Sequence, residues 1–220
     1  MKKNRKKIDW TNHIIELSVV FIGISLAFAL DNWREELNDR ELEEQYTGSF
    51  FKDISDDATN LAEIIKISEQ KEERVKSFIN LLKHKKVTQD SALVIISDIM
   101  TKTPFSPKLS TYESIKSSGN LNIISDFKLK HEIIGYYQTL IDKNMKEDVY
   151  NNYIDDYAVP YVYENLDFLN QKLINKKVLR EKKFHNLILG YYALLVQNLE
   201  TYKTIYEKTG VLKDRISSFN

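Results

Sequence analysis

The sequence predicts an all-α protein: a single transmembrane helix near the N-terminus continues into a long amphipathic helix, and a helical-bundle domain follows. Three observations predict this class. Residues 17–30 form a long uncharged apolar run. Elsewhere, apolar residues recur at steps of three and four, the pattern of helices with one buried face. The 220 residues include six glycines and three prolines, which is few for a turn-rich β architecture.

The charge pattern divides the chain into three expected segments. Residues 1–13 form a short basic segment with five Lys/Arg and one Asp. Residues 14–33 form the transmembrane helix, and residues 34–220 form the helical domain. Because basic flanks stay on the cytoplasmic side of a membrane, we expect the N-terminus in the cytoplasm and the domain outside it.

Four residues mark the expected anchor. Trp10 and Trp33 lie 23 positions apart, about 35 Å along a helix at about 1.5 Å per residue. Tryptophan prefers the two interfaces of a bilayer. Glu16 lies about one turn inside the cytoplasmic boundary, where a carboxylate still reaches the headgroups or a partner, and Gly23 lies within the apolar run. The lipid bilayer is therefore the first expected partner.

Two other interpretations of the N-terminus stay open. The basic start, the apolar middle and the Ala27-Phe28-Ala29 sequence also fit a cleaved signal peptide. An apolar run of 14 residues also occurs in buried helices of soluble proteins. Helix-forming residues continue without a breaker beyond Ala29, which favours the anchor.

The first half of the domain predicts three helices. We expect the long helix to reach about residue 83, with a break or bend over residues 66–76, where its apolar face becomes more polar. A second helix is expected over residues 92–100. A loop over residues 101–108 holds two of the three prolines. Gly119 is placed to end a short third helix in the left-handed conformation.

The second half predicts two longer helices. One is expected to be capped by Ser125 and to reach about residue 148, and Pro160 is expected to kink or restart the chain beyond it. The last helix is expected over residues 181–208, with Gly210 ending it. Together these helices predict one bundle of about four helices.

Two segments resemble a known family. ELSVVFIGISLAFALDNWREE (residues 16–36) and TYESIKSSGNLNIISDFKLKHEIIGYY (residues 111–137) are similar to the start and the central motif of the DUF6090 family. That family comprises uncharacterised membrane-anchored proteins, mostly of Bacteroidota. The resemblance implies an anchor plus a helical domain, without a known activity. Combined with the charge pattern, it implies a bacterial inner membrane and a periplasmic domain.

Two groups of residues are candidate sites. The central motif places small polar residues around a turn that could present backbone N–H groups to an anion, although a helix stop of fixed geometry explains the same residues. The second group combines tyrosines with carboxylates; it suits an aromatic pocket, or a solvated acidic surface beside core tyrosines. The candidate interaction motif is Tyr112, Glu113, Ser117, Ser118, Gly119 and Asn120, and the candidate patch is Tyr150, Tyr153, Asp155, Asp156 and Tyr157.

No catalytic, metal or cofactor site is predicted. The four histidines lack metal-ligand spacing, the glycines are scattered, and the chain has no cysteine. The carboxylates at positions 142, 147, 148, 155 and 156 could bind a cation or act as an acid–base pair, but they also suit a solvated surface. The zero net charge predicts no nucleic-acid face.

The leading hypothesis is a non-enzymatic interaction or scaffold module that binds a protein partner or itself. A ligand-sensing helical-bundle ectodomain is the main alternative. A periplasmic protein with a cleaved signal, and a metal-dependent hydrolase using Asp155 and Asp156, are further hypotheses.

Overall fold

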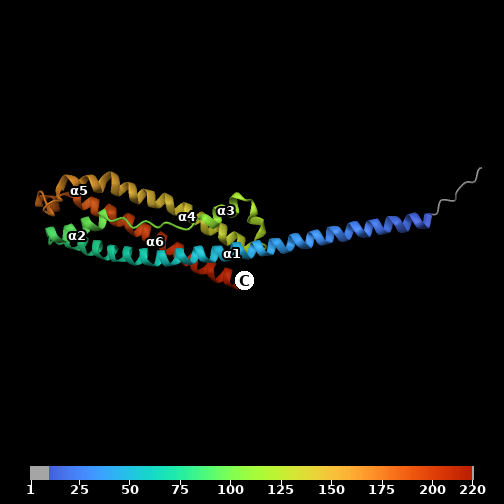
Figure 1. Ribbon diagram of the computed structural model, residues 1–220. Helices are drawn as coiled ribbons and strands as arrows, with labels where there is room; N and C mark the ends of the chain where they lie inside the picture. Colours follow the sequence, from blue (N-terminus) through green and yellow to red (C-terminus); the bar gives the residue numbers. More distant parts are fainter. Residues whose placement is uncertain (1–9, 220) are drawn as a thin grey trace, which may run out of the picture.

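The protein is a long helical rod in which one helix extends far beyond the bundle (Figure 1). The structure is a computed structural model that describes the backbone of residues 10–219 and the side chains of residues 14–219. Helix α1 (Trp10–Lys83) runs the length of the rod. Helix α6 (Lys182–Phe219) packs along its C-terminal half, and α4 (Phe127–Tyr153) packs along α6. The expected all-α class is confirmed.

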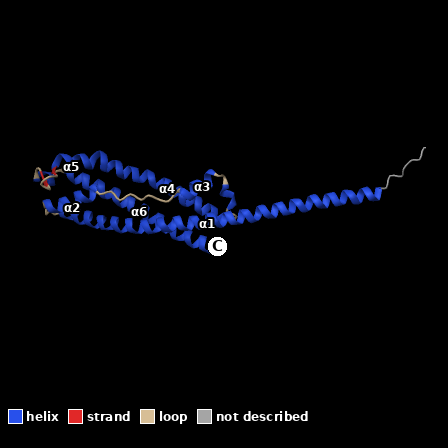
Figure 2. Ribbon diagram, in the orientation of Figure 1, coloured by secondary structure: helices blue, strands red, loops and turns tan. Residues whose placement is uncertain are grey.

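Shorter elements cover the two ends of the bundle (Figure 2). Helix α3 (Ser110–Ser117) and the 3₁₀ turn η1 (Asn120–Ile123) lie where α1 enters the bundle. The opposite end, which we call the distal tip, contains α2 (Gln89–Met100), the π-helical turn η2 (Ile154–Ala158), α5 (Val159–Asn165), strands β1 (Leu166–Asp167) and β2 (Lys172–Leu173), and the 3₁₀ turn η3 (Lys176–Arg180).

Two large apolar clusters hold the bundle together, and a third, small one of Ile96, Val162 and Leu173 lies at the distal tip. The cluster nearer α3 joins Phe50 and Ile54 of α1 to Tyr137 of α4 and Tyr202 of α6. The cluster nearer the distal tip joins α1 and α2 to η2 and α6, and includes Tyr191. Because the two clusters follow one another along α1, the bundle is long and narrow.

The first part of α1 projects beyond the bundle. Every side chain from position 14 to position 41 is exposed, including Leu17 at 71% and Phe21 at 70%. By length and composition this helix can cross a membrane. Between the apolar run and the first bundle residues near position 42, about ten mostly polar residues form a free helical stalk about 15 Å long.

Several sequence expectations need correction. Helix α1 has no break over residues 66–76, because the polar position Lys71 is buried and hydrogen-bonded rather than solvated. Helix α6 does not end at Gly210 but continues to Phe219, because Leu212 and Ile216 are buried against the bundle. The two short strands were not expected in an all-α chain.

Candidate functional site

The expected anchor residues lie on the projecting part of α1. A Cβ atom added at Gly23 would meet nothing within 4 Å outside its own stretch of helix, and Trp33 is 60% exposed. Glu16 is exposed on the same segment. Trp10 begins α1, and its side chain lies outside the described part of the chain. The described bundle does not cover this segment, which leaves its apolar surface available to lipid.

The candidate interaction motif packs against the rest of the bundle. Tyr112 stacks on Tyr137 of α4, with ring centroids 4.1 Å apart and planes 9° apart. Gly119 has φ +75°, which confirms the expected left-handed residue. The backbone N–H of Ser118 donates to the Ser114 carbonyl at 3.1 Å, and that of Gly119 donates to the Lys116 carbonyl at 3.2 Å. These two N–H groups complete the helix stop rather than a nest for an anion.

The same motif contacts α1 at the point where it enters the bundle. Hydrogen bonds with the side chains of Ser118, Ser114 and Asn120 lower the pKa of Tyr46 on α1, against a raising effect of burial. Glu113 and Ser117 remain exposed.

Two carboxylates, those of Glu43 and Asp126, make further contacts at this junction. We call the group of Glu43, Ser125, Asp126 and Arg215 the collar. The Glu43 carboxylate accepts from the backbone N–H of Ser125 at 2.6 Å and from its hydroxyl at 2.9 Å. Asp126, and not the expected Ser125, caps α4 by accepting from the Leu129 N–H at 2.9 Å, because the Ser125 hydroxyl donates to Glu43 instead. Arg215 of α6 pairs with the Asp126 carboxylate at 2.6 Å. The collar therefore ties α1, α4 and α6 together where the projecting helix leaves the bundle.

The connection over residues 101–109, which we call the strap, runs extended along the bundle (Figure 1). Extended backbone pressed against helices needs hydrogen-bond partners from side chains. Buried Lys71 donates to the carbonyls of Asp98, at 3.2 Å, and Thr101. Buried Asp57 accepts from the Lys108 N–H at 2.9 Å and from the Tyr136 hydroxyl at 2.8 Å.

A buried ion pair of α4 holds the middle of the strap. The Lys143 ammonium lies 2.6 Å from the Glu147 carboxylate, and both side chains are buried. Lys143 donates to the Phe105 carbonyl at 2.7 Å, Glu147 accepts from the Phe105 N–H at 3.2 Å, and the Tyr202 hydroxyl also donates to Glu147. Glu147 is therefore a structural group and does not belong to a solvated acidic surface or a cation site.

The candidate aromatic and acidic patch is only partly brought together. Tyr150 is buried, with its ring 6.0 Å from that of Tyr191. Asp155 pairs with Lys102 of the strap at 2.6 Å. The other three residues, Tyr153, Asp156 and Tyr157, line one shallow cavity of about 300 Å³ beside η2.

This small cavity has an aromatic wall, one cation (Lys183) and two carboxylates (Asp156 and Glu164). The Lys183 ammonium lies 5.1 Å from the centroid of the Tyr161 ring, and the Tyr153 hydroxyl donates to the Leu187 carbonyl at 3.0 Å. Burial, followed by the charge of Glu181, raises the pKa of Tyr161 to about 12, so this phenol stays neutral at physiological pH. Irregular π-helical turns such as η2 are frequent at functional sites.

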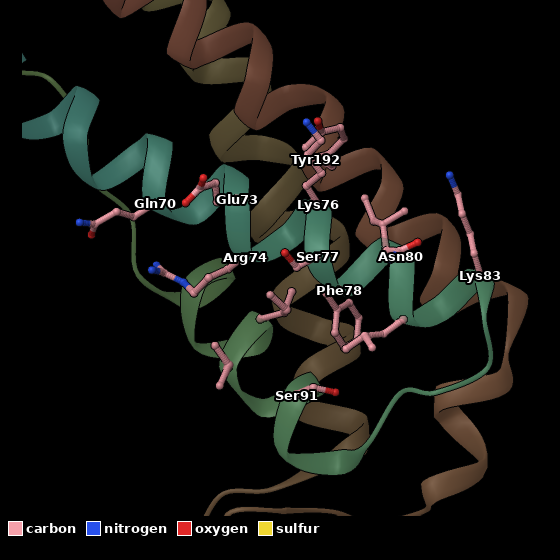
Figure 3. A pocket seen from close by; sticks show the side chains of 14 residues that line it. Gln70, Glu73, Arg74, Lys76, Ser77, Phe78, Asn80, Lys83, Ser91 and Tyr192 are labelled. Carbon is pink, nitrogen blue, oxygen red and sulfur yellow. The ribbon is translucent and has the colours of Figure 1, made fainter.

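A larger open groove was not predicted from the sequence (Figure 3). It has a volume of about 1110 Å³ and lies along the last turns of α1, with α2 and Tyr192 of α6 on its other sides. Its apolar residues include Phe78 and Val94, and Figure 3 shows Gln70, Glu73 and Lys76 on the neighbouring turns of α1. Arg74 on its wall is already bound to Asp98 by two hydrogen bonds of 2.7 Å.

Within residues 14–219, no three His, Asp or Glu side chains are grouped so as to hold a metal ion. The groove along α1 and α2 is an open surface groove of mixed polarity, which suits contact with another molecule better than enclosed chemistry.

No family model, curated protein or solved structure matches the chain. The resemblance to the DUF6090 family therefore stays a prediction from the two sequence segments.

Proposed function

We propose that this protein is a single-pass scaffold of a bacterial inner membrane, with its N-terminus in the cytoplasm and its helical domain in the periplasm. In this proposal α1 is both anchor and support. The observation that carries it is the continuity of α1 from an uncovered apolar segment, through the free stalk, into the core of the bundle.

The contacts around α1 support a mechanical role. The collar fixes the bundle to α1 near the stalk, and the strap is bound by Asp57 and Lys71 of the same helix. A helix rises about 1.5 Å per residue, so the 50 residues from Trp33 to Lys83 place the distal tip about 75 Å from the outer end of the apolar segment. Such an arrangement holds a contact surface at a set distance from a bilayer.

The open groove beside α2 is the surface we propose for a protein partner or a second copy of the chain. Site-specific photo-cross-linking from position 94, which is 49% exposed in the groove, tests this. Met145, 62% exposed on α4, provides the matched control position. The proposal expects a discrete adduct from position 94 and none from position 145 in native membranes. Only monomer from both positions would contradict it.

One observation favours a second function, the ligand-sensing ectodomain. The cavity beside η2 combines Tyr153 and Tyr157 with charges of both signs around about 300 Å³, which suits a small aromatic ligand with polar groups. A thermal-shift screen of the detergent-solubilised chain tests this function, with Tyr157→Ala as the variant expected to lose any stabilisation. Stabilisation that persists in the variant would place the ligand elsewhere.

A further inference from the structure

The charge of the molecule changes sign along its axis. Residues 31–82 carry 14 Asp/Glu and seven Lys/Arg. The distal tip and the residues that flank it, 83–100 and 154–183, carry nine Lys/Arg and seven Asp/Glu, but these charges are separated: residues 83–88 and 163–183 hold all nine cations and three of the acids. One of those acids, Asp167, is used in a local turn. One part of the end farthest from the anchor, residues 83–88 and 163–183, is therefore basic, although the shaft leading to it is acidic.

Part of this basic surface is concave. A cavity of about 810 Å³ lies between the end of α1 and η3, and Lys85, Lys176, Arg180 and His185 are among the residues that line it. No Asp or Glu lines this cavity, and no ion pair within residues 14–219 involves Lys85, Lys176 or Arg180. Three such cations around one hollow favour an anionic ligand.

The backbone fixes the position of these cations. The Leu173 N–H donates to the Gln89 side-chain oxygen at 3.3 Å, which joins the segment before η3 to the start of α2. The Asn175 side chain accepts from the Lys177 N–H at 3.0 Å and begins η3. His185 is hydrogen-bonded through Nε2 to the Leu179 carbonyl at 2.9 Å. The two basic segments are therefore held together before any ligand binds.

An apolar projection, which we call the finger, lies beside this basic surface and is formed by Phe168, Leu169 and Ile174. Leu169, at the turn between β1 and β2, is 91% exposed, and Ile174 is 64% exposed. The turn is ordered, because the Asp167 carboxylate accepts from the Asn170 N–H at 3.1 Å and from its side-chain amide at 2.8 Å. Phe168 is 47% exposed, with its ring 5.1 Å from that of Tyr163.

We propose that the distal tip binds the anionic surface of a second lipid membrane facing the anchor. The basic cavity takes phosphate headgroups, and Phe168, Leu169 and Ile174 enter the interface below them. Clustered cations beside projecting apolar side chains are the combination by which proteins bind anionic bilayers. This inference rests on the proposed anchor, which points the tip away from its own bilayer (Figure 1).

Vesicle tethering by the full-length protein tests the proposal. The chain is reconstituted into neutral phosphatidylcholine vesicles, and capture of a second, labelled vesicle population is measured. The second population is either neutral or contains about a third phosphatidylglycerol. The test variant is Lys85→Gln/Lys176→Gln/Arg180→Gln. The matched control, Arg34→Gln/Lys52→Gln/Lys66→Gln, removes three exposed charges from α1.

The proposal expects capture of anionic vesicles only. At about fivefold per cation near a membrane surface, the tip variant should lose about 100-fold in apparent affinity, and the α1 control should bind like the native chain. Leu169→Ser should weaken capture about tenfold, whereas Met145→Ser on α4 should not. Equal capture by the tip variant, or equal capture of neutral vesicles, would overturn the proposal.

Two further arms separate the sources of failure. Flotation of the chain with its own vesicles after alkaline washing shows whether the anchor is inserted in the bilayer. A chain that is anchored but captures no second vesicle contradicts this inference alone, and an acidic protein would then be the partner to test at the tip. Inorganic phosphate, added at constant ionic strength, should not displace the vesicles. Complete displacement by millimolar phosphate would identify a site for the free anion and overturn the lipid assignment.

Discussion

At the scale of single residues, buried charged side chains hold the extended backbone of the strap in place through hydrogen bonds. Lys71, Asp57, Lys143 and Glu147 are all buried, and each is hydrogen-bonded to a main-chain group of the strap or of its flanking residues. Removing one partner of a buried ion pair leaves the other charge uncompensated, which is costly. Such residues should therefore be far more sensitive to substitution than the many exposed lysines.

We expect Lys143→Met to lower the free energy of unfolding by about 3–5 kcal/mol, because it leaves Glu147 buried without its cation and the Phe105 carbonyl without a donor. Lys146→Met, one turn along on the exposed face of α4, should change it by less than about 0.5 kcal/mol. Urea unfolding of the detergent-solubilised chain measures both. Equal effects of the two variants would contradict the role assigned to Lys143.

Asp57 should give the bundle a specific pH dependence. Burial raises its pKa above the ordinary value of 3.8, against the lowering effects of hydrogen bonds from Lys108 and Tyr136. A raised pKa means that the folded state binds the proton more tightly than the unfolded state. The stability that the protonated Asp57 side chain contributes is therefore present below pH 3.8 and is lost as the pH rises through the folded-state pKa.

We therefore expect the free energy of unfolding of the native chain to fall relative to that of Asp57→Asn as the pH rises from about 3.5 to 7. Urea unfolding across this range measures it, and the exposed Asp56→Asn provides the neighbouring control. A difference that stays constant with pH would show that Asp57 does not titrate in this way.

At the scale of elements, the glycines show how local conformation decides a substitution. Gly119 is left-handed, and any other residue is strained there. Gly48 lies within α1 with open space around its Cβ position. We expect Gly119→Ala to destabilise the chain by about 1–2 kcal/mol and Gly48→Ala to stabilise it by about 0.5–1 kcal/mol. Thermal unfolding should show shifts of opposite sign; shifts of the same sign would contradict this account.

The regular elements were largely predictable, because amphipathic periodicity repeats over many turns. It placed the end of α1 at Lys83 and the loop after Met100. The continuation of α6 beyond Gly210 was not predicted. The helix continues because one glycine destabilises it by less than the burial of Leu212 and Ile216 stabilises it. Strands of two residues carry no period, so the finger at the distal tip was not predictable.

The candidate site was less predictable for a related reason. Lys71 and Glu147 have the residue types of a solvated helix face, and their burial depends on the strap, which packs on them from a different part of the chain. Likewise, the basic cavity joins residues near position 85 with residues near position 180. Sequence spacing does not show such a pairing.

At the scale of the whole molecule, the central claim is that α1 is one continuous support with its apolar segment in a bilayer and its bundle outside the cytoplasm. The chain has no cysteine, so each introduced cysteine is the one thiol in the protein. Gly23 lies in the middle of the apolar segment, and Asp39 lies on the free stalk, and both are exposed in the structure of the chain alone.

Labelling of Gly23→Cys and Asp39→Cys with a membrane-impermeant maleimide, in cells with a permeabilised outer envelope, tests this claim most directly. We expect rapid labelling at position 39 and none at position 23 until the membrane is dissolved in detergent. Labelling of both positions at the same rate, or labelling of position 39 only after the cytoplasmic membrane is broken, would contradict the claim.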